Sequence, residues 1–213
     1  MLARMDERII KTEADVAEGA AWLAATEPRF AGALAQLGPL PLRLKDDGFE
    51  ALLSAIVSQQ ISVAAARGVW AKLEAAGATR AEAILALSEE ELRSIGLSRQ
   101  KAGYARALAE HRIDFNALRR QRAATVVREL TAVKGIGVWT AEIYAMFSLG
   151  RADVFAAGDL ALQESARVLF ALPARPTEKA LRQMAEAWSP WRAVAARLLF
   201  TYYHLIKDRE GMT

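Results

Sequence analysis

The 213-residue chain contains no cysteine and only two histidines, His111 and His204. The absence of cysteine excludes disulfide bonds, thiol catalysis and cysteine-held iron–sulfur clusters. Two histidines are too few for a dedicated histidine-rich metal site. We therefore expect a protein whose chemistry uses neither thiols nor an iron–sulfur cluster.

An excess of charge and long apolar runs are also lacking. The chain has 28 Lys and Arg against 25 Asp and Glu, a net charge of +3 that permits nucleic-acid binding without arguing for it. The N-terminal stretch Met1–Arg8 has no long apolar run, so we expect no signal peptide, no membrane-spanning helix and a cytoplasmic protein. With 53% apolar residues, the chain can bury a sizeable core in one domain or two small lobes.

Apolar residues recur at helical spacing along most of the chain, and no stretch alternates long enough to predict a strand. The fold class is therefore all-α. Thr12, Ser88 with Glu91, and Thr177 are predicted helix caps. The loop 38–48, rich in Gly, Pro and Asp, is the best candidate for a boundary. We expect helices over about 12–26, 28–37, 49–57, 63–76 and 81–87, one after Ser88, one bearing Arg99 to Arg112, the hairpin 126–148, then 160–172, 177–188 and one from Pro190.

The rest of the chain is organised around the stretch Leu130-Thr-Ala-Val-Lys-Gly-Ile-Gly-Val-Trp-Thr-Ala-Glu142, which predicts two helices joined by a tight turn. Gly135 and Gly137 bracket Ile136, as suits a turn with positive φ or a close approach. The helix that follows begins with unpaired N–H groups and a positive dipole end, a natural seat for phosphate. On the glycines alone, a purely structural helical hairpin is the favoured interpretation.

Three further side chains have two readings each. Gln60 follows the apolar stripe of 49–57, and its spacing favours a satisfied buried amide or a helix-end residue over one that faces a groove. Asp159 stands where a helix begins, and from local sequence alone capping is favoured over catalysis. Trp139 heads an apolar stripe and is as well suited to the core as to a ligand pocket.

These segments together resemble the helix-hairpin-helix DNA glycosylases of base excision repair. Their hairpin is typically Leu-x-x-Leu-Pro-Gly-Val-Gly, followed by a catalytic Asp; here Lys134 stands in the place of Pro. The string Asp153-Val-Phe-x-x-Gly-Asp-Leu160 and the loop Ile56-Val-Ser-Gln-Gln-Ile-Ser-Val63 resemble the alkylpurine branch, the DNA-3-methyladenine glycosylase II type in its compact form. The resemblance runs from about Phe49 to Tyr202, whereas residues 1–47 match loosely.

The resemblance implies two helical lobes with a cleft between them. One lobe would span about 48–155, including the hairpin 126–148, and the other would combine 1–47 with 156–213. Asp159 would lie at their junction. The segment Gly96-Leu-Ser-Arg-Gln-Lys101 also has a family counterpart, and we assign it to packing first and to DNA contact second.

The implied activity is that of a monofunctional DNA glycosylase, which flips out alkylated purines such as 3-methyladenine and 7-methylguanine and hydrolyses their N-glycosidic bond. Asp159 would be the catalytic carboxylate, stabilising positive charge on the deoxyribose and orienting water. An alkylated purine is already cationic, so it leaves without a second acid. Trp139 occupies the position at which strand-cleaving relatives carry a Schiff-base lysine.

The resemblance assigns roles to further residues. It implies a base pocket of Trp139, Phe200 and Trp191, the latter two belonging first to the core stripe of the last helix. It implies DNA contacts from the wedge Gln60, from Gln59, and from the backbone of Gly135, Gly137 and Thr140. It also implies a structural monovalent or divalent cation on the carbonyls of Thr131, Val133 and Ile136.

We expect no required cofactor, duplex DNA with alkylated bases as the partner, no membrane, and a monomer. Two alternatives stay open. One is a non-catalytic DNA-binding module in which Asp159 serves only as a cap. The other is a glycosylase for oxidised or deaminated purines.

Overall fold

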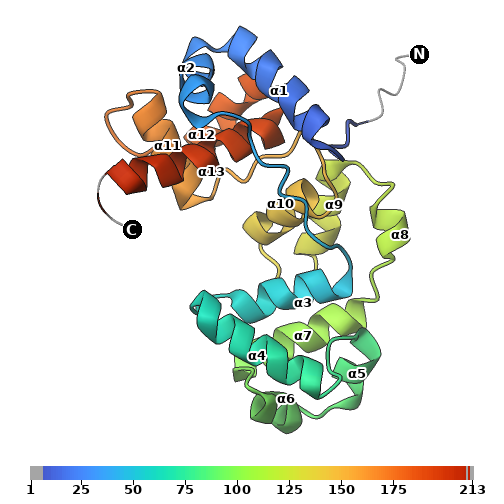
Figure 1. Cartoon of the computed structure of the whole chain (residues 1–213). Coiled ribbons are helices and arrows are strands. Elements are labelled where there is room, and N and C mark those ends of the chain that lie inside the picture. The colour runs from blue at the N-terminus through green and yellow to red at the C-terminus, as the bar shows by residue number, and fades with distance from the viewer. Residues whose placement is uncertain (1–6, 210, 212–213) are drawn as a thin grey trace, which may run out of the picture. The chain divides into compact units, whose positions relative to one another are not determined.

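The computed structural model describes residues 7–209 and 211, and within them it contains helices and one isolated bridge but no β-strand (Figure 1). The all-α prediction is confirmed. No helix in this described part is both long and apolar enough to cross a lipid bilayer. Residues 1–6, the start of the stretch considered above for a signal peptide, lie outside the described residues, as do 210, 212 and 213.

The elements follow one another as named in Figure 1. They are α1 (Glu13–Thr26), α2 (Pro28–Leu37), α3 (Phe49–Ser58), α4 (Val63–Ala75), α5 (Ala81–Ala86), α6 (Glu89–Ile95), α7 (Arg99–His111), α8 (Phe115–Leu118), α9 (Ala123–Thr131), α10 (Val138–Phe147), α11 (Leu160–Leu169), α12 (Glu178–Met184), the 3₁₀ helix η1 (Ala185–Trp188) and α13 (Arg192–Arg209).

The predicted caps are confirmed. Thr12 and Ser88 each close a capping box, in which the hydroxyl accepts from the third helical N–H and the side chain there, Asp15 or Glu91, accepts in return. Thr177 caps α12 by accepting from the N–H of Ala180. Local sequence therefore determines where these helices begin.

Three predicted helix limits are wrong by a few residues. The helix expected to reach Leu172 ends at Leu169, because Ala171 takes a positive φ of 50°. The helix expected over 177–188 tightens into η1 for its last turn. The last helix begins at Arg192 rather than Pro190, since the carbonyl of Trp191 accepts the first helical bonds, from Val194 and Ala195.

The chain forms two compact units. Unit 1 comprises Met1–Leu44 and Ala145–Thr213, and unit 2 comprises Lys45–Tyr144. In Figure 1 unit 2 runs from cyan to yellow, and unit 1 is blue at one end of the chain and orange to red at the other. One division falls inside the loop 38–48 and the other inside α10.

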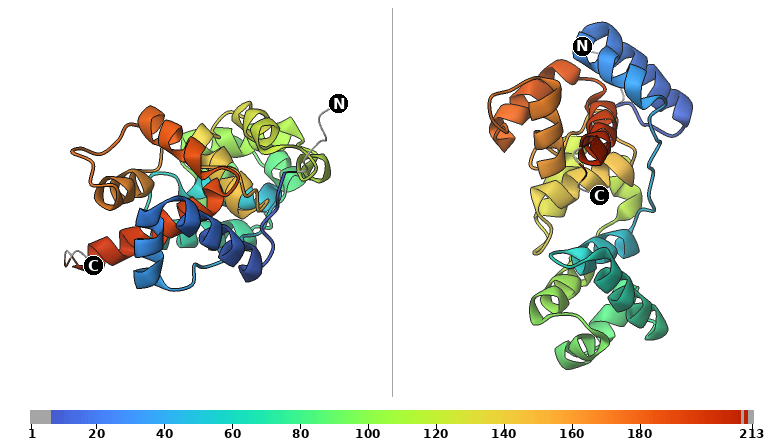
Figure 2. Two further views of the ribbon diagram at one scale, coloured as in Figure 1. Left: turned by 90° about the horizontal axis from the view of Figure 1, so that it is seen from above. Right: turned by 60° about the vertical axis from the view of Figure 1, so that its left-hand side comes forward.

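Helix α13 is the centre of unit 1. It contacts α1, α2 and α11, so that the first and last segments of the chain pack together (Figure 2). Every residue from 193 to 199 is buried, which is the pattern of a helix covered on all sides. Its core contacts include Trp188, whose ring packs on those of Phe30, Phe155 and Phe170.

One of the buried residues of α13 is a cation, Arg197, which sequence reasoning did not single out. Its Nε donates to the carbonyl of Leu42 at 2.9 Å and its Nη1 to that of Ala193 at 2.9 Å, and it lies 4.9 Å from the ring of Phe147. Burial, with Arg43 nearby, lowers the pKa of Arg197 to about 10. Arg197 therefore fastens the segment that leaves α2 to the core of unit 1.

Helix α7 has the corresponding place in unit 2, where it contacts α3, α5 and α6. In α3, the apolar stripe predicted over 49–57 is buried at Leu52, Leu53, Ile56 and Val57, but only half-buried at Phe49. In α7, the side chains of Ala102, Ala105, Leu108 and Ala109 are buried. The N–H of Gly48, which precedes α3, donates to the hydroxyl of Tyr144 at 2.8 Å. Burial raises the pKa of this Tyr144 hydroxyl to about 12.

The packing of α1 on α13 yields a stability prediction. A Cβ on Gly19 would lie 2.6 Å from Trp191 Cε3 and 2.7 Å from Val194 Cγ2, whereas a Cβ on Gly32 of α2 would meet no atom within 4 Å. Gly19→Val should lower the free energy of unfolding by about 1–3 kcal/mol through overpacking. Gly32→Ala should raise it by about 0.5–1 kcal/mol, because alanine is the better helix former. Thermal unfolding of both variants measures this; equal shifts would contradict the close contact at Gly19.

Candidate functional site

The hairpin predicted from the glycine pattern is present, with α9 ending at Thr131 and α10 beginning at Val138. Gly135 has a φ of +97°, where a side chain is strained. A Cβ there would also lie 2.7 Å from two carbons of Tyr104 on α7. Gly135 thus meets both conditions expected of a turn glycine.

Gly137 differs from its neighbour. Its φ lies outside the left-handed region, and an added Cβ would meet no atom within 4 Å. Nothing in the described protein therefore requires glycine at this exposed position. The open space beside Gly137 lies next to the first turn of α10, whose leading N–H groups have no partners within the helix.

Thr140, in that first turn, is 8% exposed, so its side chain is turned into the protein. Any DNA contact by Thr140 is therefore limited to its backbone N–H. The first helical bond of α10 runs from the N–H of Ala141 to the carbonyl of Gly137. The predicted backbone contacts of Gly135, Gly137 and Thr140 with DNA stay predictions.

The loop between α3 and α4 overturns one expectation from spacing. Gln60 is exposed and has a φ of +56°, so the buried-amide reading is wrong for this residue. The satisfied amide is its neighbour Gln59, whose Nε2 donates to the carbonyl of Gly135 at 2.9 Å. Ile61 (39% exposed) and Val63 (69% exposed) follow it, so the loop presents apolar side chains beside Gln60.

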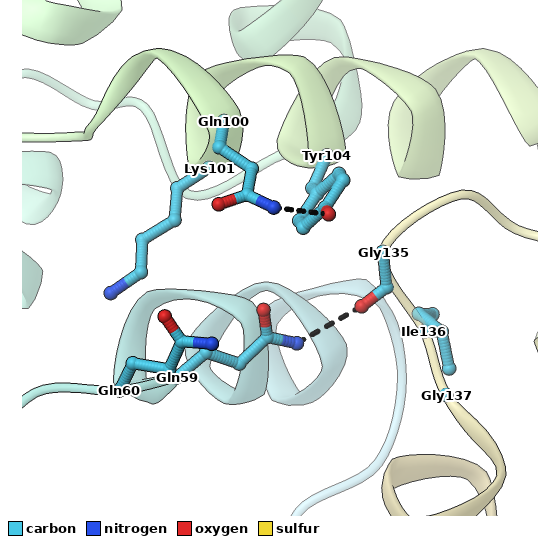
Figure 3. Close-up of a pocket in the computed structure, with 8 residues that line it drawn as sticks. All are labelled: Gln59, Gln60, Gln100, Lys101, Tyr104, Gly135, Ile136 and Gly137. Atoms are coloured by element: carbon cyan, nitrogen blue, oxygen red, sulfur yellow. Dashed lines mark hydrogen bonds between the residues drawn. The ribbon is translucent and has the colours of Figure 1, made fainter.

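A pocket of about 330 Å³ lies where this loop, α7 and the hairpin turn meet (Figure 3). It belongs entirely to unit 2. Gln100 Nε2 donates to the hydroxyl of Tyr104 at 2.6 Å, and the Gln59 bond to the hairpin lies at the pocket wall. The lining residues are Gln59, Gln60, Gln100, Lys101, Tyr104, Gly135, Ile136 and Gly137.

The carbonyls proposed for a structural cation lie in the hairpin turn. The carbonyl of Val133 accepts from the N–H of Ile136 at 3.0 Å, and both residues are buried. The hydroxyl of Thr131 donates back to the carbonyl of Val127 at 2.8 Å. Across residues 7–209 and 211, no group of three or more His, Asp or Glu side chains could hold a metal ion. The cation on the carbonyls of Thr131, Val133 and Ile136 stays a prediction.

Asp159 is the N-cap of α11 in unit 1, as its local sequence predicts. Its Oδ1 accepts from the N–H of Ala161 at 2.9 Å and from that of Leu162 at 3.3 Å. Both capping bonds use the same oxygen, and the carboxylate is partly exposed. Capping therefore orients the carboxylate without enclosing it. The next residue, Leu160, is 61% exposed.

Side-chain bonds that sequence reasoning missed hold the loop before Asp159. The buried Gln163 of α11 donates from Nε2 to the carbonyl of Ala157 at 2.9 Å. Asp153 accepts from Arg192 at 2.6 and 3.0 Å, and from the hydroxyl of Ser189 at 2.9 Å. A polar residue on the inner face of α11 was the available signal for Gln163. Only the folded chain brings Asp153 and Arg192 together.

The three aromatic candidates have different surroundings. Trp139 is 48% exposed, and so is Val138 beside it, which rules out the core reading of Trp139. Trp191 is 3% exposed, with Arg8 4.6 Å from its ring, and is a core residue of unit 1. Phe200 is half-buried, 6.2 Å from the ring of Phe147. Their roles in a base pocket stay predictions.

Comparison with known proteins places this geometry in a family. Residues 53–190, more than half of the chain, match the family described as HhH-GPD superfamily base excision DNA repair protein. DNA-3-methyladenine glycosylase 1 of Schizosaccharomyces pombe is 31% identical over 165 residues, which cover 73% of this chain and 72% of that protein.

Two solved structures are similar along most of the chain. The crystal structure of a DNA-3-methyladenine glycosidase from Bacillus halodurans is 33% identical with a TM-score of 0.81, covering 96% of this chain and 95% of that one. The Schizosaccharomyces pombe 3-methyladenine DNA glycosylase Mag1, in complex with abasic DNA, is 27% identical with a TM-score of 0.71, covering 85% and 95%. The chain belongs to the HhH-GPD superfamily of base excision DNA repair proteins.

Substitutions at the two hairpin glycines should distinguish an effect on folding from an effect on DNA binding. Gly135→Ala should lower the free energy of unfolding by about 1–3 kcal/mol, because it combines a positive φ with a clash against Tyr104. Gly137→Ala should lower the free energy of unfolding by no more than about 1 kcal/mol, the scale of an N-cap substitution. It should still weaken binding to duplex DNA, since its methyl group would occupy the space left open beside α10. Thermal melts and fluorescence anisotropy measure the two effects. Full DNA affinity in folded Gly137→Ala would show that this space is not used.

Proposed function

We propose that the protein is a monofunctional DNA glycosylase that releases alkylated purines, such as 3-methyladenine and 7-methylguanine, from duplex DNA. The observation that carries the proposal is the position of Asp159, a partly exposed carboxylate held at the start of α11 by two backbone N–H groups. The names of the similar proteins point to the same substrate class.

Asp159 would act through its charge. As the N-glycosidic bond lengthens, positive charge gathers on the deoxyribose, and a fixed carboxylate stabilises it and orients or deprotonates the attacking water. The two capping bonds restrict the rotation of the side chain, so the group needs little reorganisation during the reaction. An alkylated purine carries positive charge before cleavage, so one carboxylate suffices.

The hairpin would hold the DNA together with the wedge loop, residues 59–62 between α3 and α4, which carries Gln60. The first-turn N–H groups of α10 and the open side of Gly137 suit a phosphate, which explains binding that is independent of sequence. The exposed Gln60 would enter the space left by the flipped nucleotide. Gln59, bonded to the hairpin carbonyl of Gly135, would support the wedge rather than insert itself.

Trp139 would stack on the flipped base. Its 48% exposed indole is available to an electron-poor purine, which an aromatic face attracts through cation–π interaction. Phe200, half-buried in unit 1, would limit the size of the base that is accepted. We further propose that the protein acts as a monomer on DNA in the cytoplasm and requires no cofactor.

The catalytic assignment is tested by Asp159→Asn against a matched control, Asp114→Asn. Both aspartates are N-caps, Asp114 of α8, and Asn caps a helix as well as Asp. Both variants should therefore keep the wild-type melting temperature. Asp159→Asn should slow release of 7-methylguanine at least roughly a hundredfold, the scale of losing a charge-stabilising group, while Asp114→Asn should be as active as wild type.

Other results of that experiment would change the proposal. An Asp159→Asn variant as active as wild type would sink the mechanism. Wild-type protein that binds DNA but releases no base would favour a non-catalytic binding module. Release of 8-oxoguanine or hypoxanthine, without release of methylated purines, would change the substrate class and keep the enzyme.

The absence of a lysine at position 139 predicts that the wild-type protein does not cleave the strand. Without an amine nucleophile no Schiff base forms with the deoxyribose, so the product is an intact strand with an abasic site. Incubation with borohydride should trap no protein–DNA adduct, and strand breaks should need added alkali or heat. A trapped adduct, or breaks without alkali, would refute monofunctionality.

A further inference from the structure

The loop that carries Gln60 is held in a strained conformation. Gln60 has a φ of +56°, a left-handed conformation that is unfavourable for a residue with a side chain. The loop is short, since α3 ends at Ser58 and α4 begins at Val63 with Ser62 as its N-cap. Such a conformation persists only where neighbouring groups hold it in place.

Lys101 of α7 is one of the groups that hold it. Its Nζ donates to the carbonyl of Val57 at 2.7 Å, in the last turn of α3. The carbonyls at a helix C-terminus lack partners within the helix and carry its negative dipole end, so an ammonium group suits this place. Partial burial lowers the pKa of Lys101, because desolvation disfavours the charged form. The Lys101 side chain is thus half-buried and anchored to the end of α3.

The same helix also supports the hairpin. Tyr104 lies three residues after Lys101 on one face of α7, and its ring packs against Gly135. Gln100 fixes the Tyr104 hydroxyl with a 2.6 Å bond. Gln59 completes the connection with its bond to the Gly135 carbonyl. Figure 3 shows these side chains around one pocket. Helix α7 therefore contacts both the root of the wedge loop and the turn of the hairpin.

We propose that Lys101 is a positioning residue of the glycosylase: by holding the carbonyl of Val57 it fixes the end of α3, and so the height at which Gln60 projects beside the hairpin. Lys101 contacts neither the base nor the phosphates in this role. The inference rests on the proposed function, because it concerns the insertion of Gln60 into DNA.

A direct DNA contact is the competing role for a lysine at this pocket, and salt dependence separates the two. A lysine that neutralises one phosphate contributes about 0.9 to the slope of log binding constant against log salt concentration. In the positioning role the Lys101 ammonium contacts no phosphate, so it should contribute little to that slope. Lys101→Met should therefore leave the slope for undamaged duplex DNA unchanged. A slope lowered by about one would overturn the proposal.

The kinetic test compares Lys101→Met, Lys101→Arg and the control Lys72→Met. Lys72 is an exposed cation in the last turn of α4, in the same unit. Under single-turnover conditions with saturating protein, Lys101→Met should release 7-methylguanine at least roughly tenfold more slowly, since small displacements of a positioned group have large effects. Lys101→Arg keeps a charged donor and should recover most of the rate. Lys72→Met should match wild type.

Base flipping should follow the same order. The fluorescence of a 2-aminopurine placed next to the lesion rises when the base stack opens. This fluorescence should be lower with Lys101→Met than with wild type. Binding to undamaged DNA should stay within about twofold of wild type, because the hairpin is intact. Wild-type rate and flipping in Lys101→Met would overturn the proposal, as would a Lys101→Arg variant no faster than Lys101→Met.

Hydrogen exchange keeps this inference separate from the proposed function. In free protein, Lys101→Met should speed amide exchange over residues 58–62 and leave α11, in unit 1, unchanged. If wild type releases no base, the proposed function fails, yet this measurement still tests whether Lys101 holds the loop. Unchanged exchange over 58–62 would refute the positioning role whatever the enzyme's activity.

Discussion

The structure of unit 2 depends on the missing side chain of Gly135. Because no Cβ is present, the ring of Tyr104 lies directly against the turn between α9 and α10. That contact brings the hairpin close enough to α3 for Gln59 to bond with the carbonyl of Gly135. A single van der Waals contact thus allows three segments that are distant in sequence to surround one pocket.

In unit 1, the carboxylate of Asp159 stands at the N-terminus of α11, and neighbouring side chains fix the backbone before it. Gln163 holds the carbonyl of Ala157, and the pair of Asp153 with Arg192 ties the loop to the start of α13. These bonds lie among buried or half-buried groups, where an unmade hydrogen bond is costly. The carboxylate inherits its orientation from them, and a mobile loop could not aim it in this way.

Much of this was predictable from sequence, and the rest was not, for definite reasons. Helix limits and caps at Thr12, Ser88 and Thr177 follow from local chemistry, and so does the cap at Asp159. Helical spacing wrongly predicted Gln60, rather than Gln59, as the inner amide. The spacing rule fails there because α3 ends at Ser58 and neither residue is in the helix. Arg197 was missed since an arginine on a stripe predicts an exposed position. Its burial is made tolerable by the carbonyls of Leu42, 155 residues away, and Ala193, and by the ring of Phe147. Lys101 was assigned to packing first, which its bond to Val57 supports.

The backbone at Gln60 also limits which amino acids the position can accept. A φ of +56° disfavours side chains branched at Cβ, so Val, Ile and Thr are poor substitutes there. Gly and Asn adopt this conformation most readily, but they are too short to fill the space of a nucleotide. The residues that satisfy both requirements are long and unbranched at Cβ, such as Gln, Met, Arg and Leu. Backbone geometry alone therefore restricts position 60 to a small set of amino acids, before any contact with DNA is considered.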